Sequence, residues 1–257
     1  MISANTIFHF TNSIENIKNI LTKSFQPRYC LERIDYLNSN EKFDFAIPMV
    51  CFCDIPLSQI TEHINTYGHY AIGLKKDWAL NKGISPIIYI HPHSRTNIIF
   101  NGFFQNSIRL DSLKKYLTKE NSVENSLEAL EFMFYLKKYK GDMWRNSKLQ
   151  KDIMFYNERE WRYVPQLREI LKINPRLILN KDLFNDEKVQ KVENEKISCL
   201  DLGFVPNDIK YIIVNKETER IDMSRAIEEI KGNSFTHNDL TVLKSKIISV
   251  EQIREDF

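Results

Sequence analysis

The chain has 257 residues, of which 42% are hydrophobic and 27% are charged, and this composition excludes an intrinsically disordered protein. The net charge of +2 excludes a global electrostatic attraction to nucleic acid. No apolar run approaches the roughly 20 residues that span a bilayer, and no basic stretch followed by an apolar core marks a signal peptide. The sequence therefore predicts a cytoplasmic protein with a buried core and no membrane partner.

The first predicted strand, residues 6–10, ends directly before a predicted helix. Asn12, with Glu15 three residues later, resembles a capping box and is expected to start that helix. His9 would then lie at a strand end beside a helix N-terminus, where free backbone N–H groups can bind an anion or a ribose. A partly buried, hydrogen-bonded histidine is the alternative interpretation.

The next segments alternate between irregular chain and apolar strands. Residues 26–45 are polar and predict a long loop, whereas the near-continuous apolar run 48–54 is typical of a central strand. Asp54 is predicted to cap a following helix, because Asp is a favourable N-cap and Pro56 is tolerated in the first turn. The glycine-flanked stretch 67–74 predicts another strand.

The rest of the chain predicts mixed helices and strands. In order, we expect a helix at 75–81, a strand at 87–90 and a mainly helical segment at 111–140. Residues 170–201 predict irregular, charged chain with several weak elements, and they precede a strand at 211–214, a helix around 223–230 and a strand at 247–248. His91 and His93 flank a proline, but without a third ligand they predict a loop and not a metal site.

The stretch 155–165 is aromatic and dense in charge, and it ends in a strand-like run that Pro165 stops. Because strand side chains alternate, a strand here places Glu158, Glu160 and Arg162 on one face, with Tyr156 beside them. Carboxylates and a guanidinium on one face can gather around a ligand. A solvated edge strand carrying a local ion-pair ladder is the alternative interpretation.

Charge is uneven along the chain, since residues 131–176 contain 11 Lys or Arg against 6 Asp or Glu. Such a basic band can hold a dinucleotide or a nucleic-acid backbone, although solvated lysines explain it almost as well. The four cysteines predict no disulfide framework in a chain of this length. Cys51 and Cys53 lack the spacing of a redox motif or a zinc site, and are interpreted as small buried hydrophobes.

The absence of several motifs is also informative. The chain lacks G-x-G-x-x-G, G-x-x-x-x-G-K-[ST], H-E-x-x-H and G-x-S-x-G, which argues against Rossmann enzymes, P-loop NTPases, zincins and α/β hydrolases. The pattern of elements predicts one α+β domain over residues 1–257, with six or seven strands, flanking helices and a helical insertion at about 108–142.

Three blocks in this order resemble the AbiGi-type abortive-infection (phage resistance) family along nearly the whole chain. The blocks are Phe8-His9-Phe10-Thr11 with the following Asn16-Ile17, the run from Ile47 to Leu57, and Glu158-Arg159-Glu160-Trp161-Arg162-Tyr163-Val164-Pro165. That family is labelled an antitoxin. The same blocks are similar, more remotely, to DarT-like ADP-ribosyltransferases.

The second resemblance implies an ADP-ribosyltransferase-like core, a mixed or antiparallel sheet flanked by helices, with NAD as substrate. By it, Glu160 is the catalytic glutamate, His9 contacts the nicotinamide-side ribose, and Thr11 and Asn16 line the cofactor site. Asp54 departs from the pattern, which has an arginine after the second block. Another cation, Arg162 or Arg28, would have to bind the diphosphate.

The residue types suit that chemistry. Cleavage of the nicotinamide bond passes through an oxocarbenium-like state, which a carboxylate such as Glu160 can stabilise. Glu158 would position or deprotonate the acceptor. Several aromatic side chains could stack on nicotinamide or a base, namely Tyr67, Tyr70, Tyr156 and Trp161. Core packing explains each tyrosine individually.

Three hypotheses follow for function. The first is an NAD-dependent ADP-ribosyltransferase or NAD glycohydrolase in phage defence, whose acceptor could be DNA, RNA, protein or water. The second is a non-enzymatic antitoxin of the same family that binds a cognate toxin, an interpretation that Asp54 favours. The third is a nucleic-acid-binding protein that uses the basic band 131–176.

Overall fold

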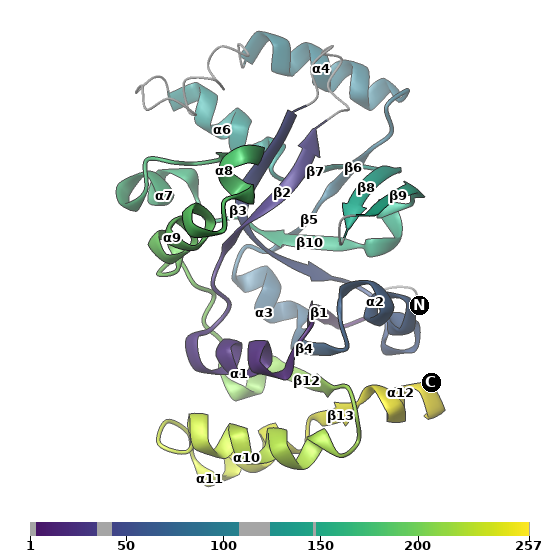
Figure 1. The fold of residues 1–257 in the computed structure, drawn as a ribbon, viewed down its shortest axis with the longest axis vertical. Coiled ribbons are helices and arrows are strands. Elements are labelled where there is room, and N and C mark those ends of the chain that lie inside the picture. The colour runs from purple at the N-terminus through teal and green to yellow at the C-terminus, as the bar shows by residue number, and fades with distance from the viewer. Residues whose placement is uncertain (1–3, 35–42, 108–123, 146–147, 257) are drawn as a thin grey trace.

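A nine-stranded mixed sheet forms the centre of the computed structural model, which describes residues 4–34, 43–107, 124–145 and 148–256 (Figure 1). Its main path runs β13-β12-β4-β1-β3-β10-β5, and β2 and β11 add to β3. The bounds are β1 (Thr6–Thr11), β2 (Arg28–Ile34), β3 (Phe43–Cys53), β4 (Tyr70–Lys75), β5 (Ser85–Pro86), β10 (Glu160–Tyr163), β11 (Leu179–Asn180), β12 (Ile209–Val214) and β13 (Ile247–Ser249). Only β12 and β13 pair in parallel among the neighbouring strands described in this sheet.

Strand β3 organises this sheet. It is a long apolar strand, and its first half pairs with β2 and β11 while its second half pairs with β10. Cys53, the last residue of β3, is opposite Phe8 of β1 on one side and Glu160 of β10 on the other. The first and third sequence blocks therefore meet across the end of the second.

The sheet separates between β1 and β3. Six residue pairs join β1 to β4 from Thr6 to Thr11, but the β1–β3 register consists of the single pair Phe8 and Cys53. Beyond that pair the two strands diverge, and backbone groups that a continuous ladder would occupy become available to side chains. This divergence creates the space in which the candidate site lies.

Two small sheets lie beside the main one. Strands β6 (Ile88–Ile90) and β7 (Leu136–Lys138) pair in parallel, and β8 (Gly141–Arg145) and β9 (Lys148–Ile153) form an antiparallel hairpin. The chain between β6 and β7 contains α4 (Arg95–Ser107) and α6 (Glu124–Met133), which pack on each other at the top of Figure 1. Part of the expected helical insertion, 108–123, lies outside the described residues, and strand β7 falls within its expected range.

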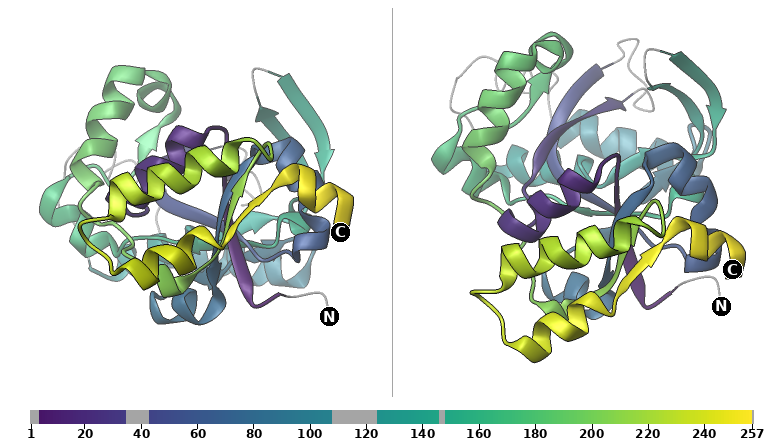
Figure 2. Two further views of the ribbon diagram at one scale, coloured as in Figure 1. Left: turned by 90° about the horizontal axis from the view of Figure 1, so that it is seen from below. Right: turned by 60° about the horizontal axis from the view of Figure 1, so that its bottom comes forward.

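Helices cover the sheet on several sides. The remaining helices are α1 (Ile14–Lys23), α2 (Ile60–Tyr67), α3 (Lys76–Asn81), α7 (Leu167–Ile173), α8 (Lys181–Asn185), α9 (Glu187–Ile197), α10 (Glu219–Lys231), α11 (His237–Lys244) and α12 (Val250–Asp256), with 3₁₀ turns η1 (Leu57–Gln59), η2 (Phe155–Glu158) and η3 (Pro206–Asp208). Helix α1 packs along α10, as the two views of Figure 2 show. The predicted α+β class with a mixed sheet flanked by helices is confirmed.

Two long segments that were predicted to be irregular are ordered. Residues 28–34 form β2 within the expected loop 26–45, and residues 35–42 of that loop lie outside the described part. The expected irregular segment 170–201 contains most of α7 and all of α8 and α9. The loop prediction was wrong for residues 28–34, and the weak elements expected in 170–201 are regular helices, because these polar sequences gain their apolar contacts only by packing on the sheet, as buried Tyr29 and Ile197 do.

Two predicted helix caps were also wrong. Ser13 is the N-cap of α1, because its hydroxyl accepts a hydrogen bond from the Asn16 backbone N–H at 3.3 Å, whereas Asn12 precedes it. Asp54 caps no helix: η1 has Pro56 at its N-cap, and the Asp54 carboxylate forms an ion pair with Lys76 at 2.8 Å. An ion pair with a partly buried lysine thus replaced the expected cap.

Gly68 fixes how α2 returns to the sheet. Its φ of 120° is a backbone conformation that side chains disfavour, and a Cβ atom there would lie 2.2 Å from the Thr11 carbonyl oxygen. This close approach ties the end of α2 to the end of β1. In the part of the chain that the structure describes, no helix is long and apolar enough to cross a membrane.

Candidate active site

A cavity of about 230 Å³ lies where β1, β3 and η2–β10 come together. Its charged lining residues are Glu32, Lys137, Glu158 and Glu160, and its ring-bearing lining residues are Phe8, His9, Phe10, Phe52, His63 and Tyr67. The cavity therefore combines carboxylates with flat apolar walls. It brings together residues from the first and third sequence blocks, as the resemblance implied.

Glu160 is positioned by three local features. Arg159, directly before it, adopts the left-handed conformation with φ 45°, which turns the chain from η2 into β10. The backbone N–H of Glu160 donates to the Tyr89 hydroxyl at 2.9 Å, and the residue is opposite Cys53 in the sheet. The side chain that results is buried, only 6% exposed, and lines the cavity.

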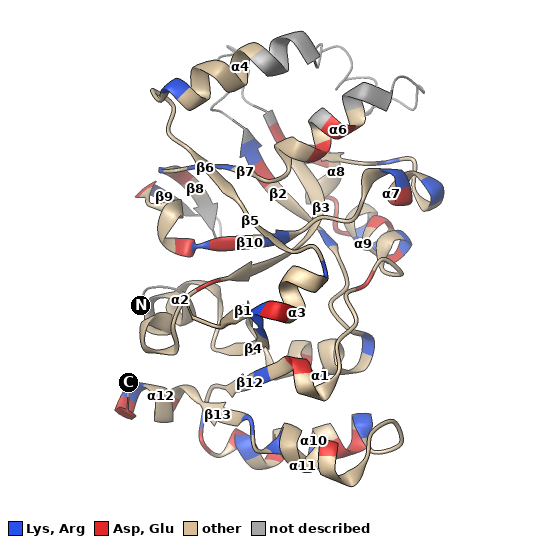
Figure 3. Cartoon of the chain, turned by 180° about the vertical axis from the view of Figure 1, so that it is seen from behind, with Lys and Arg blue, Asp and Glu red and all other residues tan. Residues whose placement is uncertain are grey.

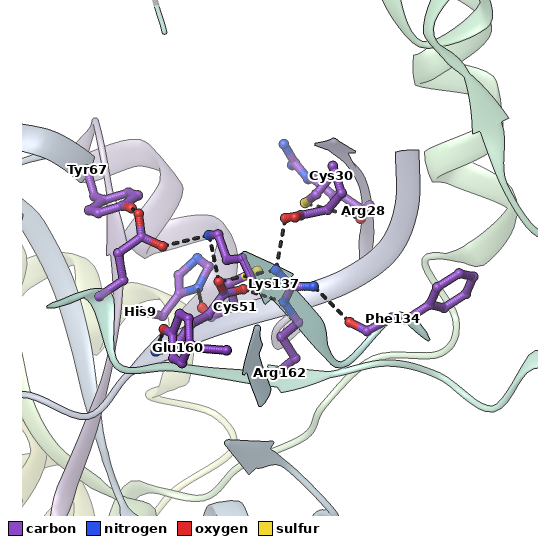
Figure 4. Close-up of polar contacts among 12 residues, drawn as sticks. His9, Arg28, Cys30, Cys51, Tyr67, Phe134, Lys137, Glu160 and Arg162 are labelled. Atoms are coloured by element: carbon purple, nitrogen blue, oxygen red, sulfur yellow. Dashed lines mark hydrogen bonds and ion pairs between the residues drawn. The ribbon is translucent and has the colours of Figure 1, made fainter. Parts of the chain in front are cut away.

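Arg162 lies on the same face of β10 as Glu160 and is fully buried. Its guanidinium donates to both Glu160 oxygens, at 2.5 and 3.2 Å, and also to Glu32 at 2.9 Å and the Phe134 carbonyl at 2.8 Å (Figure 4). Arg162 is therefore committed to internal partners and does not line the cavity, which argues against the predicted role in diphosphate binding.

Lys137 joins the two carboxylates of the site. This residue of β7 places its ammonium 2.6 Å from a Glu158 oxygen and 2.9 Å from a Glu160 oxygen. The Tyr67 hydroxyl donates to the other oxygen of Glu158. Figure 4 shows the Lys137 side chain reaching between the carboxylate beside Tyr67 and Glu160. The two glutamates thus face one cation from separate elements.

Glu158 reaches this position from a 3₁₀ turn and not from a strand. The expectation that Glu158 and Glu160 share a strand face was wrong, since Glu158 ends η2 and the strand begins at Glu160. Tyr156 does not join them: it is 50% exposed and packs against Tyr89 and Tyr139. The solvated-edge alternative is also excluded, because β10 lies between β3 and β5 and its charged side chains are buried.

The charges of the site determine its protonation. Burial alone would raise the pKa of Glu160, but the charges and hydrogen bonds of Arg162 and Lys137 outweigh it and hold that pKa below its ordinary range. Burial opposes the charge of Lys137, yet Glu160, Glu158 and Glu32 raise its pKa well above the usual value. At neutral pH the pair is therefore a carboxylate and an ammonium.

His9 occupies the space where β1 and β3 diverge. Its Nδ1 is 2.8 Å from the Cys51 carbonyl oxygen, which can only accept, so Nδ1 carries the proton and Nε2 remains an acceptor. The ring packs edge-on against Phe25 and Phe52. Burial lowers the pKa of His9, and Arg28 adds to the effect against the hydrogen bond to Cys51. His9 is thus a neutral, oriented imidazole at the cavity wall.

Thr11 and Asn16 lie in an adjoining cavity of about 210 Å³ that shares His9 and Cys51 with the first. The Asn16 side-chain amide donates to the Thr11 hydroxyl at 2.7 Å. Arg28 also lines this second cavity. On the other side, a cavity of about 480 Å³ shares Glu32, Lys137 and Met143 with the first. Together the three adjoining spaces fall within the volume range of small-molecule and cofactor sites.

Tyr70, like Arg162, is a predicted site residue that lies outside the lining of the central cavity. Its hydroxyl donates to Glu219 of α10 at 2.9 Å, and it does not line the cavity that contains Glu160. The two tyrosines of the predicted strand separate because Tyr67 ends α2 whereas Tyr70 begins β4. Trp161 faces away from Glu160 and packs with the core on the opposite side of β10.

Of the two cysteines that were interpreted as buried hydrophobes, Cys53 is buried and Cys51 is partly buried, whereas Cys30 is partly buried and Cys199 is exposed. All four are free thiols, and burial raises the pKa of Cys53 well above its usual value. Among the described residues, no group of three or more His, Cys, Asp or Glu side chains is arranged to hold a metal ion. The basic band 131–176 is divided, because the partly buried Lys137 and the fully buried Arg162 are held in ion pairs, and Figure 3 shows red and blue segments side by side along β10.

Comparisons with known proteins identify the family. Residues 23–215 match the family model described as "Putative abortive phage resistance protein AbiGi, antitoxin". The chain is also 30% identical over 253 residues to "Abortive phage resistance protein AbiGi" of Lactococcus lactis subsp. cremoris, covering 91% of this chain and 100% of that relative. The chain belongs to the AbiGi family. This confirms the first resemblance.

No solved structure matches the chain at a significant level. The resemblance to DarT-like ADP-ribosyltransferases consequently rests on the residues of the three sequence blocks alone. The AbiGi match extends across β2, β3, β10 and their flanking helices. It therefore includes all three carboxylates that line the cavity, Glu32, Glu158 and Glu160, together with Lys137.

Two charged residues of the site were missed by the sequence analysis. Lys137 lay in the segment 111–140 that was expected to be mainly helical, although it directly follows an apolar run that contains the buried residues Phe134 and Leu136. A lysine at the end of such an apolar run was the available signal. Glu32 lies in the segment 26–45 that was predicted to be a loop. No local pattern indicated its contact with Arg162, which is 130 positions later in the chain.

Proposed function

We propose that this AbiGi-family protein acts in anti-phage defence as an NAD-dependent ADP-ribosyltransferase or NAD glycohydrolase. The observation that carries the proposal is the shared cavity of His9, Glu158 and Glu160, which come from two distant parts of the chain. An ionised, buried carboxylate beside a neutral, oriented imidazole is the arrangement that ribose recognition and stabilisation of an oxocarbenium-like state require.

In the proposed reaction the bond between ribose C1′ and the nicotinamide nitrogen breaks, and nicotinamide leaves with the bonding electron pair as a neutral molecule. Glu160 stabilises the positive charge that develops on the sugar. The acceptor then adds to C1′ and loses a proton, which Glu158 is placed to receive. Water as acceptor gives hydrolysis, whereas a hydroxyl or amine gives transfer of ADP-ribose.

The cavity walls suit a flat ring. His63 stacks on Tyr67 with an interplanar angle of 29° and centroids 5.8 Å apart, and Phe10 lies 6.1 Å from His63. Nicotinamide can lie along such a wall. On the His9 side, Arg28 lines the adjoining cavity together with Thr11 and Asn16, and it is the arginine we assign to the diphosphate in place of Arg162.

The test is release of nicotinamide from NAD by purified protein, with nucleic acid or cell lysate supplied as acceptor. Glu160→Gln and His9→Ala should abolish most of the release. Glu193→Gln is the matched control, because Glu193 is equally buried and ion-paired to Arg176 but lies outside the cavity. Absence of turnover under every condition, with the proteins folded, would remove the enzymatic proposal.

A second function, binding of a cognate toxin without catalysis, is favoured by one specific observation. Both oxygens of Glu160 already have cationic partners, Arg162 and Lys137, so a substrate must compete for this carboxylate. The family description as an antitoxin agrees with this alternative. It predicts a stoichiometric complex with a neighbour-encoded protein, and neutralisation of that protein unaffected by Glu160→Gln.

A further inference from the structure

Apart from Lys137, the charged side chains of described residues that line the central cavity are all negative. Three of its lining residues are carboxylates, Glu32, Glu158 and Glu160, and Lys137 is the one lysine or arginine among the described residues that line it. Arg162 lies behind the wall and binds two of these carboxylates. Without the ammonium, three negative charges would face a single buried guanidinium.

The polar contacts of the Lys137 side chain are made by its ammonium group. Its Nζ bridges Glu158 and Glu160 at 2.6 and 2.9 Å, and it lies 5.0 Å from the centroid of the Phe155 ring. The side chain is partly exposed, and both the central cavity and the adjoining cavity of about 480 Å³ are in contact with it. A lysine side chain has several rotatable bonds, so the ammonium can move into the larger cavity while its backbone stays in β7.

We propose that Lys137 is an internal occupant of a binding site for a flat organic cation of the pyridinium class. Its ammonium takes the position between the two carboxylates, next to the His63–Tyr67 wall, that such a cation takes when bound. The inference deepens the proposed function and rests on it, because the nicotinamide ring of NAD is a pyridinium. Lys137 thereby occupies the space between the two carboxylates for as long as no organic cation is bound there.

A purely structural ion pair makes a different prediction. If Lys137 only stabilises the fold, replacing it weakens the protein and leaves the cavity no better at binding cations. If Lys137 is an internal competitor, its removal frees the carboxylates and strengthens cation binding specifically. A neutral ring of the same shape separates the electrostatic effect from a simple gain of space.

The experiment measures binding of 1-methylnicotinamide, a pyridinium cation, and of neutral nicotinamide by calorimetry at pH 8. Lys137→Met should bind the cation about tenfold or more tightly than the wild type, since one competing charge a few ångströms away has been removed. Binding of nicotinamide should change by less than about twofold, since it carries no charge. Lys76→Met is the matched control, because Lys76 forms a comparable ion pair with Asp54 outside this cavity.

If Lys137→Met does not fold, Glu158→Gln is compared with the double variant Lys137→Met/Glu158→Gln, which removes one carboxylate together with the ammonium. The inference then requires tighter cation binding by the double variant. An unchanged or weaker affinity for the cation, an equal gain for nicotinamide, or no cation binding by either protein would overturn it. Tighter cation binding without any NAD turnover would uphold the cation site and count against the enzymatic proposal alone.

Discussion

Replacement of Arg162 by methionine is the perturbation for which the structure gives the clearest magnitude. Methionine has a similar length and no polar atoms, so the change removes the guanidinium with little change in volume. It leaves Glu160 without its two-oxygen contact, Glu32 without its partner, and the Phe134 carbonyl without a donor. All of this occurs at a fully buried position.

Breaking a buried ion pair by removing one partner costs about 3–5 kcal/mol, and an unsatisfied buried carbonyl adds about 1–3 kcal/mol. Because Lys137 still contacts Glu160, we expect the lower part of that combined range, about 4 kcal/mol in the free energy of unfolding. The whole free energy of unfolding of a single domain is about 5–15 kcal/mol, so this loss is a large part of it. For a chain of this size the expected fall in melting temperature is about 8–16 °C.

The assay is urea denaturation followed by tryptophan fluorescence, with a parallel thermal melt. Glu160→Gln combined with Arg162→Met removes both charges, and the cycle of single and double variants isolates their coupling. The double variant should recover a substantial part of the lost stability. A loss below about 1 kcal/mol for Arg162→Met, the value of an exposed pair, would refute the assignment of this guanidinium as the buried centre of the network.

Three further predictions follow from particular contacts. The pKa of Glu160 is lowered in the folded protein, so its charge stabilises the fold above the unfolded pKa of about 4.3, and this stabilisation is lost as the pH falls below that value. The difference in unfolding free energy between wild type and Glu160→Gln should therefore shrink from pH 6 to pH 3 in urea titrations. Tyr67→Phe should lower NAD turnover, whereas Tyr70→Phe, whose hydroxyl contacts Glu219, should leave it unchanged in the same nicotinamide-release assay. Gly68→Ala should cost about 2 kcal/mol or more in unfolding free energy, because its Cβ would meet the Thr11 carbonyl and its φ is unfavourable; equal melting temperatures would contradict this.

The strands of the sheet centre could be predicted from sequence because their apolar patterns are local. Strands β1, β3, β4 and β12 lie at or near their predicted positions, since each has an apolar sequence pattern whose side chains are buried in the structure. Strand β2 could not be predicted in this way. Its charged sequence becomes a strand only because the long strand β3 offers an adjacent edge for pairing.

The site was partly predictable for the same reason. Glu160 and His9 were found because each adjoins a recognisable strand, and the structure places both at one cavity. Lys137 and Glu32 were not found, because their roles depend on contacts with residues 23 and 130 positions away. Asp54 was predicted to be a helix N-cap because Asp is generally favoured there, but in the structure its carboxylate is paired with Lys76, which lies close in space.

The most direct measurement of the central claim is a crystal structure of Glu160→Gln with NAD bound. The account predicts the nicotinamide-side ribose within hydrogen-bond distance, about 3 Å, of the residue 160 side chain, with the Lys137 ammonium displaced. NAD bound at another surface, or absent while Lys137 remains between the two side chains at saturating NAD, would contradict it.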